Sequence, residues 1–313
     1  MNIFDRIQKQ IQEITETESS IFLDSVSLHL ERAEYYYNLG ENDSYYYNDV
    51  IYRTNHAFEG ALKEAYKILA NKTNEEVTKQ TPYKIEKYFE DNGVFKERVL
   101  ELFKNYRSEW RNKSTHDYKL FFDNNEAFIA ITSVSSFVFL LFNQIIEKIA
   151  FDYEQDKINT SKKTFLKLKE DGMKVARGLF EMITMSLVDN INYEEFKDKS
   201  PLETQIIGFL KANLSWYFKE GNVLEEPKIK GNLRPDFIIE LSGDKIVLEV
   251  KKFSKKLNKK PMWSQLLTYL RYADIKEGIV FALDVSSPIK PLKIEERVVE
   301  FENKEYTLRI INN

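Results

Sequence analysis

Cysteine is absent from the 313 residues of the chain, which excludes disulfide bonds, thiolate metal sites and cysteine nucleophiles. No apolar run of membrane-spanning length occurs either, because Ser, Thr, Asn and Gln side chains interrupt residues 127–150. We therefore expect this segment to be a buried helix. The first ten residues lack the apolar segment of a signal peptide. These absences predict a cytoplasmic protein with no membrane partner.

An excess of positive charge is also missing. The net charge is −4 and the sequence pI is about 5.7, which argues against a protein that coats nucleic acid through bulk electrostatics. The charge is nevertheless uneven, because residues 201–313 contain 19 Lys and Arg against 16 Asp and Glu, giving +3 and leaving −7 for residues 1–200. The carboxy-terminal part is therefore the basic part of the chain.

The apolar content is sufficient for two domains. Hydrophobic residues make up 42% of the chain and aromatic residues 14%, which is enough to fill sizeable cores. Helical spacing of apolar side chains predicts an all-α domain over residues 1–153, followed by a helical connector over residues 154–200. Residues 201–313 combine helix and strand patterns, so we expect an α+β multidomain protein.

The carboxy-terminal domain is predicted in the order helix, three strands, helix, strand, closing hairpin. The continuous apolar run at residues 278–285 is typical of a strand buried on both faces. The predicted elements are a helix over 201–218, a first strand over 222–230, a hairpin over 237–251, a helix over 263–272, the strand at 278–285 and a hairpin over 297–311 that turns at Glu302 and Asn303.

The strongest chemical signal lies in residues 234–269. Alternation in the second strand of the hairpin places Glu249 and Lys251 on one face, where Asp236, at the start of the partner strand, can meet them. Two carboxylates suit a hard cation such as Mg²⁺ or Mn²⁺, and a lysine can neutralise a phosphate or orient an attacking water. The alternative is an ordinary solvated pair, since Glu and Lys two residues apart on a strand usually face water.

The complete pattern is longer than that pair. Pro-Asp, a hairpin, Glu-x-Lys and a helix carrying Gln265 and Tyr269 together resemble the PD-(D/E)xK restriction-endonuclease-like nucleases, including the Gln-x-x-x-Tyr element of one subgroup. The resemblance implies an α/β core of order αβββαβ and a metal held by Asp236 and Glu249. It also implies that Lys251 assists the nucleophile and that Gln265 positions water or strand.

Two further features bear on that resemblance. Family members often add a metal-binding glutamate from the preceding helix, a position that Glu203 matches; its alternative role is a first-turn glutamate favoured by the helix dipole. Six lysines fall within residues 251–260. We expect Lys252, Lys255 and Lys256 to bind nucleic acid, although a lysine run is also common in a plain solvated loop.

A second chemical signal occurs in the helical part, where Arg111 and Asn112 are followed by His116, one of only three histidines. Capping roles for Arg111 and Asn112 with a surface His116 are the plain alternative. With the surrounding helices, however, residues 15–150 resemble the HEPN domains, whose motif is Arg-x-x-x-x-His. The resemblance implies a homodimer in which both motifs line one cleft.

The chemistry of this second motif requires no metal. A histidine can remove the proton of a ribose 2′-OH near neutral pH, while an arginine stabilises charge on the phosphate, so the site would act on RNA. Asn112 would orient the arginine or histidine, and Arg107 would contact phosphate.

Three functions are consistent with the sequence. The first is a Mg²⁺-dependent nuclease, with DNA the favoured substrate, acting through Glu203, Asp236, Glu249, Lys251 and Gln265. The second is a metal-independent RNase acting through Arg111 and His116, with the carboxy-terminal domain recognising nucleic acid. The third is a non-catalytic binding or scaffold protein in which one or both sites have decayed, with amino-terminal helices that serve only in dimerisation or sensing. Proteins that combine these two kinds of domain resemble prokaryotic antiviral defence or toxin effectors, a role that rests on resemblance alone.

Overall fold

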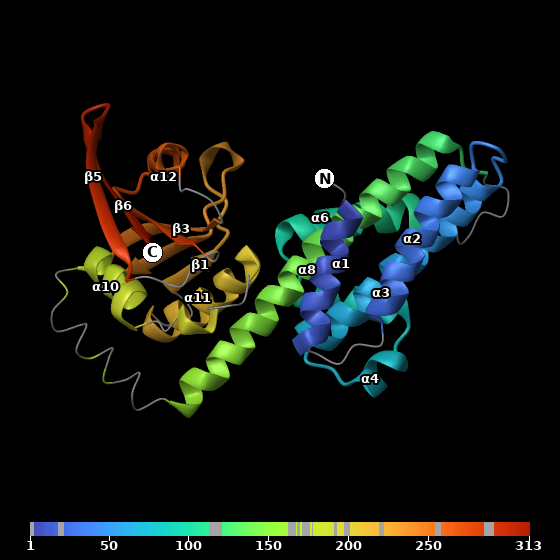
Figure 1. The fold of residues 1–313 in the computed structure, drawn as a ribbon, viewed down its shortest axis with the longest axis horizontal. Helices are drawn as coiled ribbons and strands as arrows, with labels where there is room; N and C mark the ends of the chain where they lie inside the picture. Colours follow the sequence, from blue (N-terminus) through green and yellow to red (C-terminus); the bar gives the residue numbers. More distant parts are fainter. Residues whose placement is uncertain are drawn as a thin grey trace. The chain divides into compact units, whose positions relative to one another are not determined.

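The computed structural model describes residues 3–17, 22–112, 121–161, 167, 170, 176, 178–190, 193–196, 201–218, 222–253, 258–284 and 291–313. The chain forms two compact units, Met1–Ile149 and Ala150–Asn313. The first is helical and the second contains a mixed sheet of six strands (Figure 1). The α+β class expected from the sequence is therefore confirmed. His116, Lys255 and Lys256 lie outside the described residues.

The helices of the first unit pack around aromatic side chains. Phe58, Phe103 and Phe137 are fully buried and contact one another at ring centroid distances of 4.9 to 6.3 Å. Such pairs stabilise a core beyond the area they bury. The elements are α1 (Ile3–Thr17), α2 (Leu23–Leu39), α3 (Tyr46–Leu69), α4 (Asn74–Thr78), α5 (Pro82–Asn92), α6 (Glu97–Tyr106), a π-helix η1 (Arg107–Arg111) and α8 (Asn124–Thr160), which continues into the second unit.

Helix α8 contains the apolar segment noted in the sequence. It is long and apolar enough to cross a membrane by length and composition, but 56% of its most apolar window is buried. Ala127, Val134 and Leu141 are fully buried on one side, whereas Phe128 and Ile129 are more than half exposed. The buried side confirms the expected core helix.

The second unit begins with short helices and then builds its sheet. Strand order is β1-β2-β3-β4-β6-β5, with β4 parallel to both β3 and β6 and the other pairs antiparallel. The elements are α10 (Leu179–Met185), η2 (Ser186–Asn190), η3 (Tyr193–Phe196), α11 (Glu203–Phe218), β1 (Val223–Glu225), η5 (Lys230–Asn232), β2 (Phe237–Leu241), β3 (Asp244–Phe253), α12 (Lys259–Ala273), β4 (Glu277–Asp284), β5 (Lys293–Phe301) and β6 (Lys304–Asn312).

Each face of the sheet has its own apolar core. Helices α10 and α11 cover the face that includes Phe237, Leu248 and Phe281. Helix α12 covers the other face, where Val247 and Val280 lie. Strand β4 is buried from both sides, which confirms the prediction for residues 278–284, the part of the predicted strand that the structure describes.

Helix α12 approaches the sheet closely at Gly278. A Cβ at this glycine would lie 2.8 Å from Cδ1 of Leu266 and 3.0 Å from Cδ2 of Leu270. Both leucines are fully buried, so a side chain at position 278 would require the packing between α12 and β4 to change. The missing side chain therefore permits the observed distance between α12 and β4.

The turns were predicted more accurately than the first strand. Ser242 and Gly243, and Glu302 with Asn303, all have positive φ, as two-residue hairpin turns require. The strand predicted over 222–230 is wrong beyond Glu225. Glu226 has a φ of 44°, and its N–H donates to the carbonyl of Asp236, so pairing with β2 ends there.

Candidate active site

Five polar side chains from β3, α12 and the loop before β2 meet beside the β2–β3 hairpin. Register pairs Phe237 with Leu248, which places Asp236 across from Glu249. Since side chains alternate along a strand, Asp236, Glu249 and Lys251 lie on the sheet face that α12 covers. Helix α12 contributes Gln265 and Tyr269 to the same face.

The hairpin backbone fixes both carboxylates. Oδ2 of Asp236 accepts the N–H of Val250 at 2.7 Å, and Oε2 of Glu249 accepts the N–H of Asp236 at 3.2 Å. Each carboxylate therefore has one oxygen held by the backbone of the opposite strand. Glu249 is only 3% exposed, so its position is set by its surroundings rather than by solvent.

The other oxygen of Glu249 is held by side chains. Oε1 lies 2.7 Å from Nζ of Lys251 and accepts a hydrogen bond from Nε2 of Gln265 at 3.1 Å. The same amide nitrogen donates to the hydroxyl of Tyr269 at 2.9 Å. Gln265 and Tyr269 thus connect α12 to the carboxylate, which is a direct structural reason for their spacing of four residues.

Glu203 lies beside this cluster, in the first turn of α11. Its Oε2 accepts the backbone N–H of Lys252 at 2.9 Å, and this bond ties the first turn of α11 to β3. Its charge still acts on Asp236, Glu249 and Lys251. Glu203 therefore has a clear structural role beside the site.

Burial and like charge act on the ionisation of the carboxylates. Burial, followed by the charge of Glu249, raises the pKa of Asp236 to about 7, although the Val250 N–H and Lys251 oppose the change. Burial also raises the pKa of Glu249 against the opposing effect of Lys251. Two neighbouring carboxylates that resist ionisation provide a place where positive charge is stabilised.

Lys251 remains an ammonium in this setting. Burial lowers its pKa, but the negative charges of Glu249, Asp236 and Glu203 outweigh burial and raise it overall. Its Nζ is therefore a hydrogen-bond donor at neutral pH, and it can orient an anion or a water molecule.

The donor set suits a hard divalent cation that keeps part of its water shell. Asp236 and Glu249 offer carboxylate oxygens, the ligands preferred by Mg²⁺, which is commonly held by one or two carboxylates together with water and phosphate. Within the described residues, no group of three or more His, Cys, Asp or Glu side chains is placed to hold a metal ion. Asp236 and Glu249 could therefore supply two of the ligands of such a cation, and the metal-binding role expected of Glu203 stays a prediction.

The chain was compared with protein-family models, curated proteins and solved structures. None of them matches. The assignment of this site therefore depends on its own geometry and on the residue pattern.

The second predicted site is described only in part. Arg111 lies on the π-helix η1, and its Nε is 3.8 Å from both Glu59 and Glu86; its Nη1 donates to Oδ1 of Asn112 at 3.2 Å. Arg107, expected to contact phosphate, donates to Glu90 at 2.9 Å. The arginines of this region are therefore engaged by carboxylates of α3 and α5.

The lysines predicted to bind nucleic acid are also partly engaged. Lys252 is half-buried. Lys259, which belongs to the same lysine-rich segment but was not among the predicted residues, is paired with Glu295 of β5. Lys255 and Lys256 remain predictions.

Some contributors to these sites were not identified from the sequence. The Val250 and Lys252 N–H groups belong to the backbone, and almost every residue type has such a group, so the sequence does not indicate their role. Glu86 could have been identified from the sequence. It follows Ile85 on the apolar side of α5, and a carboxylate buried there requires a cationic partner.

Proposed function

We propose that the second unit is a divalent-metal-dependent nuclease that hydrolyses phosphodiester bonds, with DNA as the favoured substrate. The observation that carries this proposal is the meeting of Asp236, Glu249 and Lys251 on one face of the β2–β3 hairpin, with both carboxylates oriented by backbone N–H groups. The pattern Pro-Asp, Glu-x-Lys and Gln-x-x-x-Tyr supports it independently. The proposal concerns the site, since fold alone does not specify activity.

The two carboxylates would hold the cation. Oxygens of Asp236 and Glu249 would bind Mg²⁺ or Mn²⁺, which when bound supplies a Lewis acid for the phosphate and a more acidic water. The raised pKa values of both carboxyls agree with this role, because positive charge between them would relieve their repulsion and favour the ionised forms.

Lys251 would act on the substrate. Its ammonium, 2.7 Å from Glu249 Oε1, is held at the edge of the carboxylate pair, where it can donate to a non-bridging phosphate oxygen or to the attacking water. Either contact places a donor where negative charge develops during hydrolysis. The carboxylate partner restricts the lysine to this position.

Gln265 would act through Glu249. By donating to Glu249 Oε1 and to the Tyr269 hydroxyl, its amide fixes the orientation in which the carboxylate meets a cation. Groups that orient a metal ligand commonly change metal affinity or activity by about 10- to 100-fold when they are removed.

The test is cleavage of labelled single- and double-stranded DNA and RNA by the full chain, in Mg²⁺, in Mn²⁺ and in EDTA. We expect cleavage in the divalent cations only, and a loss on the order of 100-fold or more in Lys251→Ala. Lys245→Ala is the matched control, because Lys245 lies on the same strand, is exposed and pairs with Glu240 away from the site. Cation-dependent cleavage that is equal in both variants would overturn the proposal.

A further inference from the structure

Strand β5 forms one edge of the sheet. It pairs with β6 along nine positions, and no strand among the described residues pairs with its other side. At about 3.3 Å per residue it presents a backbone edge roughly 30 Å long. The opposite edge, β1, has three residues. A long open edge is a template for another strand, and proteins generally protect such edges.

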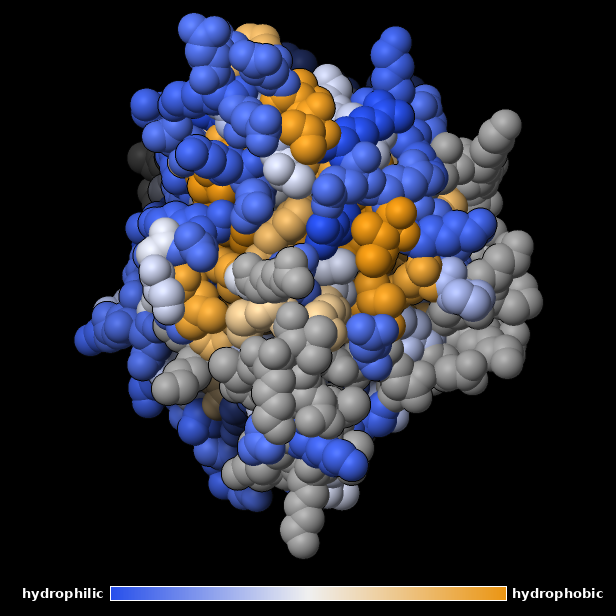
Figure 2. Space-filling view, turned by 90° about the vertical axis from the view of Figure 1, so that its left-hand side faces the viewer, coloured by the Kyte–Doolittle hydropathy of each residue, from blue (hydrophilic) through white to orange (hydrophobic). Residues whose placement is uncertain are grey.

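The two faces of this edge strand carry different side chains. On the face turned to α12, Arg297 lies over the ring of Trp263 at 4.9 Å, and Glu295 pairs with Lys259. On the other face, Ile294 is 48% exposed and Val298 57% exposed, with Glu296 between them. Figure 2 views the molecule from the side on which β5 lies in Figure 1, and apolar patches lie there among hydrophilic side chains.

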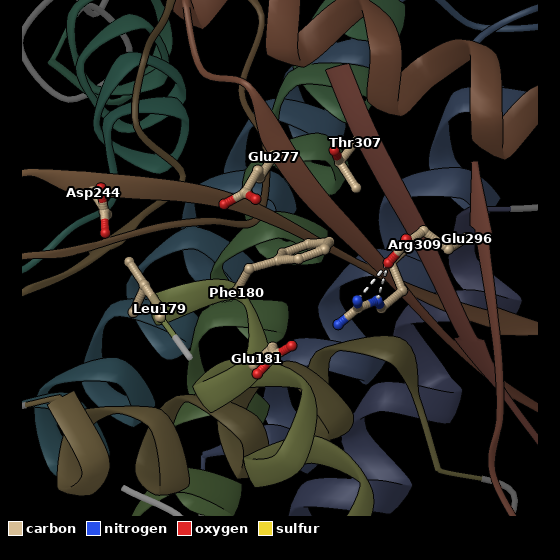
Figure 3. Close-up of a pocket in the computed structure, with 9 residues that line it drawn as sticks. Leu179, Phe180, Glu181, Asp244, Glu277, Glu296, Thr307 and Arg309 are labelled. Carbon is tan, nitrogen blue, oxygen red and sulfur yellow. Dashed lines mark hydrogen bonds and ion pairs between the residues drawn. The ribbon is translucent and has the colours of Figure 1, made fainter. Parts of the chain in front are cut away.

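The negative charge of Glu296 is balanced by an ion pair within its own chain. It accepts hydrogen bonds from Arg309 of β6, as Figure 3 shows, and the Arg309 guanidinium lies 4.1 Å from the ring centroid of Phe180. These residues line a cavity of about 460 Å³ whose other described walls include Asp244, Glu277 and Thr307. Because its charge is paired, Glu296 can lie opposite a second carboxylate at smaller cost than an unpaired glutamate.

The sequence of β5 is self-complementary in one register. Residues directly opposite each other in an antiparallel strand pair have their side chains on the same face of the sheet. When two identical strands pair about a two-fold axis perpendicular to the sheet, one residue therefore lies opposite its own copy, and the axis passes midway between the two. With the axis at Glu296, Ile294 lies opposite the partner's Val298, and Glu295 lies opposite the partner's Arg297; both pairs occur twice by symmetry. The two copies of Glu296 face each other at the axis, and each is paired with Arg309 of its own chain.

The neighbouring registers lack this match. An axis at Arg297 places the two arginines together and sets Glu296 against the partner's Val298. An axis at Glu295 sets Lys293 against the partner's Arg297, and an axis at Val298 sets Glu296 against the partner's Glu300. Like charges directly opposite each other destabilise a strand pair, whereas apolar and opposite-charge pairs stabilise it.

We propose that β5 is a homodimer interface, in which the β5 strands of two copies pair antiparallel about Glu296 and join two six-stranded sheets into one. The occupant is a second copy of this chain because the exposed apolar residues and the charges of β5 complement their own symmetry mates. This interface belongs to the second unit alone and does not depend on the nuclease proposal.

Oligomeric state over a wide range of protein concentration tests the interface. We expect sedimentation to show reversible self-association of the full chain, with at least tenfold weaker association in the double variant Ile294→Lys/Val298→Lys. Both sites are exposed, so the variant should fold. Leu224→Lys on β1, 46% exposed on the opposite edge, is the matched control and should associate like wild type. Association unaffected by the β5 variant would overturn the proposal.

A cysteine placed at the predicted axis tests the register. The chain contains no cysteine, so Glu296→Cys introduces a single thiol. Facing Cα atoms of an antiparallel pair lie about 4.5–5.5 Å apart, within disulfide reach. We expect rapid oxidation of Glu296→Cys to a covalent dimer and little of Val298→Cys, because a thiol at position 298 would face Ile294 of the partner subunit. Equal rates in both variants would refute the register, and a dimer formed by neither would refute strand pairing with a second copy.

Discussion

Oδ2 of Asp236 accepts the backbone N–H of Val250 at 2.7 Å, so the side chain that precedes one strand is fixed by the backbone of the next. The carboxyl is held in place although its pKa is raised to about 7, first by burial and then by Glu249. In the metal-free protein, the hydrogen bond from Val250 favours the ionised carboxylate, whereas burial and the charge of Glu249 disfavour it more strongly. The free energy of unfolding should therefore depend on pH.

Asp236 should make the metal-free protein less stable as the pH rises. An unfolded aspartate ionises near pH 3.8 and the folded one near 7, so between these values the unfolded state releases its proton first and the free energy of unfolding falls. Above pH 7 the loss is complete, at ~2–4 kcal/mol. Urea unfolding in EDTA from pH 5 to 8 should show this decline.

Asp236→Asn is the control for that decline, because the amide keeps an oxygen that can accept the Val250 N–H but does not ionise. We expect the variant in EDTA to be more stable than wild type at pH 8, and Mg²⁺ to stabilise wild type but not the variant. Equal pH profiles for the two proteins would show that this carboxyl does not titrate as described.

Gln265 should affect turnover through the orientation of Glu249. Gln265→Met removes both hydrogen bonds of the amide while keeping a similar length, and we expect kcat or Mg²⁺ affinity to fall about 10- to 100-fold with little change in KM for nucleic acid. Tyr269→Phe removes only the hydroxyl and should have a smaller effect. An unchanged Mg²⁺ titration and kcat in Gln265→Met would exclude this positioning role.

Two substitutions should separate the hydrogen bond that Glu203 accepts from the effect of its negative charge. Glu203→Gln keeps an oxygen for the Lys252 N–H, so its thermal unfolding should match wild type. Glu203→Ala leaves that N–H without its partner and should cost about 1–3 kcal/mol. Calorimetric Mg²⁺ titration should show a smaller loss of affinity in Glu203→Gln than in Glu249→Gln; the reverse order would make Glu203 a principal ligand.

Glu86 should destabilise the first unit at neutral pH. It is 2% exposed, and burial raises the pKa of its carboxyl despite Arg111 and Arg107. The unfolded state therefore ionises first, and stability falls as the pH rises above about 4.5. Arg111→Ala should cost a further ~1–3 kcal/mol by removing a compensating charge, whereas Glu86→Gln should flatten the pH profile. Unfolding followed by circular dichroism provides the measurement.

The positions of site residues could be predicted where they depend on the regular spacing of side chains along a strand or helix. They could not be predicted where they depend on how one element packs against another. Glu249 and Lys251 share a face because they are two residues apart, and Gln265 and Tyr269 because they are four apart on a helix. The engagement of Glu203 by the Lys252 N–H depends on how α11 packs against β3, which residue identity does not encode. The end of β1 at Glu226 was missed for a similar reason, since a positive φ at a glutamate has no reliable sequence signal.

The close approach of α12 to β4 at Gly278 has a consequence for the chemistry. Gln265 precedes Leu266, whose methyl group would collide with a side chain at position 278. Gly278 thereby limits how closely α12 packs on the sheet, and with it the distance from the Gln265 amide to Glu249. A larger residue at position 278, outside the polar cluster, should lengthen that hydrogen bond.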